Sequence, residues 1–492
     1  MKPFLLALAA FMLWQDAARA TTYFHFSQNG AGAMDGTTNN PQSLAWVNAY
    51  YHVGPGTNLW LDGTINSAVG IISNYVTLNL GGNGIATPNA QCVFIYPNVV
   101  SPTIDGTGGG YLACTANGTL LTNQTPVWAI NCGGTVTGLT VKNLIINNIY
   151  VNVAPSDPNN FSDTTGGIYD VQDQGNSFFL NIRMTNVGTA IAIVPSGTAT
   201  VSNFNIYNQN HGIELNTTGL TGGNLFVENS FFGDTANWDA SGGQYHHDSG
   251  FIWFGSGTMN SVTWSNVMFI GNNGTYGNAA IYNQSGVATN GVTWINLVAI
   301  NKAGTLADGL FNLGGGSLVG STLSDNTGSL PLLLNIGGGG LVMLDNIFNG
   351  GKQYVDITSA VTSGNVGANL YANTVGGTPW QVNGTGYTPS QFSTYQSVSG
   401  GTTSRNYPST AVINTATGTL LAGSPAIHAG LYESANPFDI LGATRPNPPS
   451  IGAYEIPSSP GAGGVTLLGT PSGVVLSGVA SGGVVLTGVP QQ

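Results

Sequence analysis

The chain has 492 residues with 73 glycines, only 6% charged residues and a formal net charge of −12. Its 41% hydrophobic content excludes a disordered chain, and its acidity argues against nucleic acid and anionic membrane surfaces as partners, because both repel negative charge. Glycine-rich turns between runs of Val, Ile and aromatic residues predict an all-β protein of many short strands.

The N-terminus is typical of an export signal. Lys2 precedes an apolar run over residues 4–14, and the small residues Ala18 and Ala20 suit cleavage after Ala20. The run is shorter than the roughly 20 apolar residues that a membrane-spanning helix needs. We therefore expect residues 1–20 to be a signal peptide, the protein to be secreted or extracellular, and the mature chain to have no membrane span.

Three cysteines, Cys92, Cys114 and Cys132, lie close together in the sequence. An exported protein can form one disulfide from them and leave one thiol over. The alternative is that all three are small buried side chains in successive turns of the chain. No CxxC pair or histidine-rich spacing indicates zinc, and no metal ligands are assigned.

A repeat of about 20 to 30 residues runs through the middle of the chain. The segments "SFFLNIRMTNVGTAIAIVPSG" (177–197) and "ATVSNFNIYNQNHGIELNTTG" (199–219) show its parts: an alternating strand, a second short strand ending near an Asn, a turn, and a third strand opened by a small residue. Such a unit cannot bury its apolar face alone, so it must stack on its neighbours. The repeat predicts a parallel β-helix solenoid.

One asparagine recurs at the same turn of each repeat. A side-chain amide there can cap backbone groups, and Asn tolerates left-handed backbone geometry. We expect these residues to form a polar ladder: Asn143, Asn181, Asn203, Asn229, Asn266 and Asn296.

Segments at both ends carry a resemblance to a known superfamily. Thr21–Gly63 has a Tyr-x-x-x-Ser opening and a Pro-Gly-Thr before its first strand, "PTIDGTG" (102–108) follows, and "LLAGSPAIHAGLYESANPFDILGATRPNPPSIGAYE" (420–455) closes the region. These segments resemble those of secreted bacterial right-handed parallel β-helix proteins of the pectate-lyase-like superfamily. His428 stands where the closing motif of those proteins usually has Asp. The resemblance implies a right-handed β-helix with an N-terminal cap and a C-terminal closing segment.

The expected organisation has five parts. They are a signal peptide (1–20), an N-terminal cap with an entry strand (21–75), the β-helix (76–395), the closing segment (396–456) and a Gly/Val-rich tail (457–492). The tail repeats a Gly-Val-Val-Leu-Ser/Thr-Gly unit whose alternation favours strands. A sorting signal, an extra pair of strands and a disordered extension remain alternatives for it.

Aligning the third strands on their small opening residues brings ionisable groups together. His211 precedes Gly212, and "HHD" (246–248) precedes Ser249 and Gly250. Strands of neighbouring coils lie about 4.8 Å apart, so His211 and the triplet are expected on neighbouring coils. Alternation points Glu214 outward, and we expect Tyr169 and Ile252 at the equivalent places on the coils below and above.

Glycosidic hydrolysis requires one carboxylic acid and one carboxylate as base or nucleophile. Glu214 and Asp248 are the first candidates, with His211 or His247 tuning a carboxylate or binding a hydroxyl. "NHGIEL" and "HHDSGF" are similar in placement to the catalytic strands of polygalacturonase-like hydrolases, although Asn-Thr-Asp, Asp-Asp and Arg-Ile-Lys motifs are missing. The expected substrate is a polysaccharide.

Two insertions, Val153–Gly167 and Gly233–Asp248, are predicted to build walls beside this patch. Aromatic side chains there are expected to offer flat surfaces to sugar rings. The candidate substrate-binding residues are Tyr169, Asp170, Asp173, Trp238, Asp239, Tyr245 and His246, with Asp234 as a further reserve carboxylate.

Two other functions stay open. A polysaccharide lyase would use calcium and a Lys or Arg base, but Lys142, Arg183, Lys302 and Lys352 all fall outside the aligned column. No other cofactor is expected. A non-catalytic surface or adhesive β-helix is the second alternative, with the Gly-rich tail serving export or attachment.

Overall fold

The computed structural model describes most of the chain after the N-terminus. The described residues are 22–49, 53–88, 91–115, 127–149, 166–171, 174–220, 222–235, 249–272, 279–283, 292–303, 309–337, 339–361, 364–373, 376–431, 433, 436–456, 466–470 and 473–477. The predicted signal peptide lies outside them.

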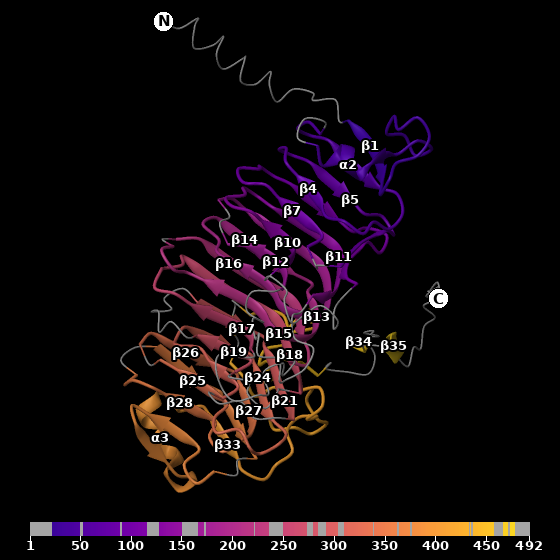
Figure 1. Cartoon of the computed structure of the whole chain (residues 1–492). Helices are drawn as coiled ribbons and strands as arrows, with labels where there is room; N and C mark the ends of the chain where they lie inside the picture. The colour runs from indigo at the N-terminus through magenta and orange to yellow at the C-terminus, as the bar shows by residue number, and fades with distance from the viewer. Residues whose placement is uncertain are drawn as a thin grey trace, which may run out of the picture.

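Parallel strands dominate the fold, which confirms the all-β prediction. The strands form three stacks, and the chain contributes a strand to each stack in turn. Each strand pairs in parallel with its counterpart about one repeat further on in the sequence. One strand from each stack forms a rung, and the rungs follow one another from β1 at one end of an elongated body to α3 at the other (Figure 1).

The strands of each stack are as follows. The first stack contains β1 (Tyr23–Ser27), β3 (Asn58–Leu61), β5 (Thr77–Asn79), β8 (Thr103–Asp105), the starts of β11 (Thr140–Ile149) and β13 (Ser177–Ile193), β14 (Thr198–Ser202), the starts of β16 (Asn224–Phe232) and β18 (Ser261–Asn272), β20 (Val292–Ile295), β23 (Ser317–Val319), β26 (Leu341–Leu344) and β29 (Gly364–Gly367). The second contains β6 (Gly84–Thr87), β9 (Tyr111–Cys114), the end of β11, the middle of β13, the start of β15 (Asn205–Asn216), the ends of β16 and β18, β21 (Val298–Ala303), β24 (Thr322–Asp325), β27 (Ile347–Gly350), β30 (Leu370–Ala372) and β33 (Arg405–Tyr407). The third contains β4 (Val69–Ile71), β7 (Val93–Ile95), β10 (Trp128–Cys132), β12 (Gly166–Asp170), the ends of β13 and β15, β17 (Ser249–Phe254), β19 (Ile281–Asn283), β22 (Phe311–Asn312), β25 (Leu334–Ile336), β28 (Val355–Ile357) and β31 (Trp380–Val382).

Short elements stand at both ends of the stacks. Near the N-terminus, β2 (Gln42–Ser43) leads into α2 (Leu44–Val47), where the Ser43 side chain accepts a hydrogen bond from the Trp46 amide and caps the helix. At the far end, β32 (Thr385–Tyr387) pairs antiparallel with β31, and η3 (Pro389–Gln391) runs into α3 (Phe392–Ser399). In the tail, β34 (Thr466–Thr470) and β35 (Gly473–Ser477) form an antiparallel pair, as the alternation favoured.

Alternating apolar side chains of all three stacks meet in one continuous core. In β16, Leu225 and Val227 are buried while Phe226 and Glu228 are exposed, which is the period-two pattern of a strand with one face to solvent. Cys92, Cys114 and Cys132 are buried thiols of this core and form no disulfide, so the reading as small buried side chains is confirmed. Among the described residues, no helix is both long and apolar enough to cross a membrane.

The predicted asparagine ladder is confirmed. All six residues have positive φ angles between 50° and 57°, at the turn between the first and second stacks. The amide of Asn181 donates to Asn143 Oδ1 at 2.9 Å, and that of Asn296 donates to Asn266 Oδ1 at 3.1 Å. A second ladder, of Asn148, Asn186 and Asn208, has the same geometry at the other end of the second stack.

The closing segment packs along the outer side of the second stack. Ile440, Ala453 and Tyr454 cover Val298 and Ile300, and a neighbouring cluster joins the closing segment to β27 and β30. These clusters are separate from the main core, so the segment covers a face that would otherwise meet water. It is a strap across several rungs rather than a lid on the last one.

Arg445 connects this strap to the asparagine ladder. Its guanidinium donates to Asn296 Oδ1 at 2.9 Å and to Glu455 Oε1 at 2.8 Å. Gly320 occupies the next position along the ladder, and a Cβ there would meet Arg445 and Asn436 within 3.1 Å. The missing side chain at Gly320 therefore makes room for the guanidinium.

Candidate functional site

Two columns of residues run across the third stack where the sequence placed its candidate site. The entry column contains Trp128, Gly166, Thr189, His211 and Ser249, each in register with the next. The Glu214 column contains Asn131, Tyr169, Ala192, Glu214, Ile252 and Tyr282, also in register. The predicted alignment of His211 with Ser249 is confirmed.

Both columns lie on the outer side of the third stack because the alternation of inward and outward side chains is interrupted between them. Ala190 and Ile191 are consecutive, fully buried members of the core. One rung on, Ile213 is in the core, and a Cβ added to Gly212 would lie 2.6 Å from the core ring of Phe232. Two neighbouring residues thus point inward, so the residues before and after each pair point outward. This places His211 and Glu214 on one face.

An aromatic contact between the columns supports this arrangement. The ring centroids of Trp128, in the entry column, and Tyr169, in the Glu214 column, lie 5.0 Å apart. Gly166 makes the contact sterically feasible, since a Cβ there would stand 2.4 Å from the Trp128 ring. Sequence reasoning missed Trp128, although its spacing before the inward pair Ala129 and Ile130 matches that of His211 before Gly212 and Ile213.

Glu214 is half-buried in the same column as Tyr169. Burial and the negative charge of Glu214 together raise the pKa of the Tyr169 phenol. The expected neighbours need one correction: Ile252 does lie on the next rung, but Ala192 stands between Tyr169 and Glu214, so Tyr169 is two rungs away.

His211 lies deeper than Glu214. Its side chain is only 3% exposed, and the register partners Thr189 and Ser249 are fully buried. The hydroxyls of Thr189 and Ser249 have no hydrogen-bond partner among the described residues. Buried hydroxyls usually have a partner, so water is the partner we expect at this end of the entry column.

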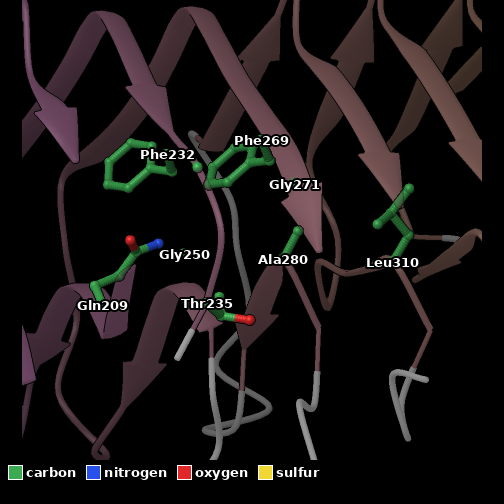
Figure 2. A pocket seen from close by; sticks show the side chains of 9 residues that line it. Gln209, Phe232, Thr235, Gly250, Phe269, Gly271, Ala280 and Leu310 are labelled. Carbon is green, nitrogen blue, oxygen red and sulfur yellow. The ribbon is translucent and has the colours of Figure 1, made fainter. Parts of the chain in front are cut away.

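A small pocket lies behind the entry column, at the corner between the second and third stacks (Figure 2). Its cavity volume is only about 10 Å³, and it is lined in part by Gln209, Phe232, Thr235, Gly250 and Phe269. The amide of Gln209 points toward the space below the two phenylalanine rings (Figure 2). Gln209 is fully buried, and neither of its side-chain polar atoms has a hydrogen-bond partner among the described residues. No sequence pattern distinguishes Gln209 from the other polar residues of its repeat.

The remaining candidates divide into two groups. The Asp170 side chain is fully buried and accepts a hydrogen bond from Ser177 Oγ at 3.3 Å, so it faces inward, and Asp234 is exposed at the end of the second stack. The others lie outside the described residues: Asp173, Trp238, Asp239, Tyr245, His246, His247 and Asp248.

The described residues contain no group of three or more His, Cys, Asp or Glu side chains that could hold a metal ion. Comparison with known proteins adds no relative: neither a protein-family model nor a curated protein matches this chain.

Proposed function

We propose that the chain is a right-handed parallel β-helix of the pectate-lyase-like superfamily. Three stacks of parallel strands in register, the left-handed asparagine ladder and the strap formed by the closing segment support this assignment. The resemblance of the entry and closing segments points the same way. Fold alone does not determine chemistry, so the function has to come from the site.

We propose further that the protein is a secreted enzyme that hydrolyses glycosidic bonds of an extracellular polysaccharide. One observation carries the proposal: the half-buried carboxylate of Glu214 stands on the same outward face as His211 and in the same column as Tyr169, whose ring pairs with that of Trp128. A carboxylate beside an aromatic surface is what a glycosidase offers to the glycosidic oxygen and to the sugar ring.

Each residue then has a role that its position permits. Glu214 is one member of the acid/base pair, and Asp248 is proposed as the other. The Tyr169 ring provides a flat apolar surface for a sugar, and its phenol contributes a hydrogen bond to a hydroxyl. His211, whose register partners are the buried Thr189 and Ser249, positions substrate or a carboxylate from the deeper end of the face.

The test is release of reducing ends from a panel of polysaccharides by the secreted protein. Glu214→Gln and Asp248→Asn should each abolish most of the release. Glu228→Gln is the matched control, because Glu228 is an exposed carboxylate on the first stack. Ultraviolet-absorbing unsaturated products would indicate a lyase instead, and glycan binding without turnover would indicate a non-catalytic β-helix. Full activity of Glu214→Gln would refute the proposed site.

A further inference from the structure

An uninterrupted outward column crosses the first stack, away from the two columns of the candidate site. We name it the Thr–Phe face. Its members pair in register from rung to rung: Thr77, Thr103, Thr140, Phe178, Thr200, Phe226, Thr263, Thr293 and Ser317. Its side chains alternate along each strand with buried core residues such as Phe179 and Val201.

Two phenylalanines stand out on this face. Phe178 is 40% exposed and Phe226 is 38% exposed, whereas the other exposed large side chains of the first stack, Tyr23 and Trp60, lie at its N-terminal end. Only the rung of Thr200 separates them, so their Cα atoms lie about 10 Å apart along the column. Each phenylalanine has a threonine on the rung before it and on the rung after it. The face is therefore flat, half apolar and half hydroxylic.

The charge of this face favours an uncharged partner. From β8 to β18 its outward positions include only three charged side chains, Asp105, Lys142 and Glu228, and Lys142 Nζ is paired with Asp105 Oδ2 at 3.0 Å. A second copy of the chain would bring another net charge of −12 against it, and anionic lipids or nucleic acid would be repelled similarly. A neutral glycan meets no such penalty.

We infer that the Thr–Phe face is a second glycan-binding surface, which holds neutral polysaccharide while the third stack acts on it. Sugar rings have apolar faces that stack on aromatic side chains and hydroxyl edges that hydrogen-bond to threonine. The Phe178 and Phe226 rings are the anchors, and the threonine column keeps an extended chain aligned with the rungs. The inference rests on the proposed function in taking a glycan as the ligand, but it places that ligand on a different stack.

The experiment measures adsorption of the full chain to insoluble cellulose, chitin and xylan by depletion isotherms. Phe178→Ala/Phe226→Ala should weaken adsorption to the preferred glycan by at least about tenfold, because two stacking surfaces are lost. Phe178→Trp/Phe226→Trp should retain adsorption, which guards against an alanine variant that merely folds poorly. Phe438→Ala is the matched control, since Phe438 is 51% exposed on the closing segment.

The outcomes separate this inference from the proposed hydrolysis. Glu214→Gln should lose turnover and keep adsorption, whereas the double alanine variant should keep turnover of short soluble oligosaccharides. Unchanged adsorption of a folded double alanine variant, or no adsorption of the wild type to any of the glycans, overturns the inference and leaves the hydrolase proposal standing. A dimer in light scattering that the double variant dissociates also overturns it, because the face would then bind a second copy.

Discussion

The carboxylate of Glu214 influences the phenol of Tyr169 from two rungs away. Ala192 is the residue between them in the same outward column, and its side chain is too short to separate the two groups. Burial is the larger cause of the raised Tyr169 pKa, and the negative charge of Glu214 adds to it. The relationship joins the proposed catalytic carboxylate to the proposed sugar platform.

The first prediction uses this coupling. Glu214→Gln removes the negative charge, so the pKa of Tyr169 should fall toward the usual tyrosine value without reaching it, because burial remains. Nuclear magnetic resonance of ring-labelled tyrosine measures the titration, and Tyr169→Phe assigns the signal. An unchanged titration would show that the two side chains do not meet in solution.

The second prediction concerns turnover. Removing a general acid or base typically slows catalysis by about 10² to 10⁴-fold, so Glu214→Gln should lose that much in kcat. Tyr169→Phe keeps the ring and should change kcat much less, with any loss confined to KM. Comparable losses in the two variants would contradict the roles assigned to these residues.

The third prediction concerns Arg445. It is 5% exposed, and replacing it by Met leaves Glu455 buried without its cation and removes the hydrogen bond to Asn296. Breaking a buried ion pair costs about 3–5 kcal/mol of unfolding free energy, which urea unfolding measures. Arg405→Met, at an exposed arginine of β33, should change stability little. Near-equal stability of the two variants would mean that the strap is not held through Arg445.

The fourth prediction is a pH dependence at Asp345. Burial raises its pKa to about 7, and the amide of Leu431 and the charge of Arg445 only partly oppose this shift. The folded state therefore holds the proton of Asp345 more tightly than the unfolded state does. As pH rises from about 4 to 7, the contribution of Asp345 to the free energy of unfolding falls by about 4 kcal/mol.

Asp345→Asn tests this pH dependence directly. The amide keeps the acceptor for Leu431 N–H and suits the positive φ of 56° at this ladder position. The variant should be more stable than the wild type at pH 8, and the difference should shrink toward pH 4. Unfolding midpoints measured at both pH values check this, and parallel profiles would contradict the shifted pKa.

The fifth prediction concerns Gln209. Its buried amide has no partner among the described residues, so Gln209→Met should raise the unfolding free energy by about 1–2 kcal/mol by removing unsatisfied polar atoms. Gln381→Met is the control, because the Gln381 amide donates a hydrogen bond to Asp356 Oδ2 at 3.3 Å. Removing that amide should not stabilise the protein. A destabilised Gln209→Met would indicate that the amide is satisfied by a bound molecule or by water.

Local conformational preferences made several features predictable from the sequence alone. Asparagine adopts a left-handed backbone with little strain, so Asn143 and its five counterparts could be assigned to one turn before any coordinates were known. Strands alternate with a period of two, so the outward position of Glu214 between Ile213 and Leu215 also followed. The small residue at Gly212 marked the register that aligns His211 with Ser249.

The tertiary structure decided what distant segments do to one another. The ring of Trp128 packs against that of Tyr169, and Arg445 donates a hydrogen bond to Asn296, 149 positions away in the sequence. No local sequence pattern predicts either contact. The burial of His211, and the lack of a hydrogen-bond partner for Gln209 among the described residues, likewise depend on the side chains of the neighbouring rungs. Periodicity specifies which way a side chain points from its own strand, whereas burial and partners depend on the strands stacked beside it.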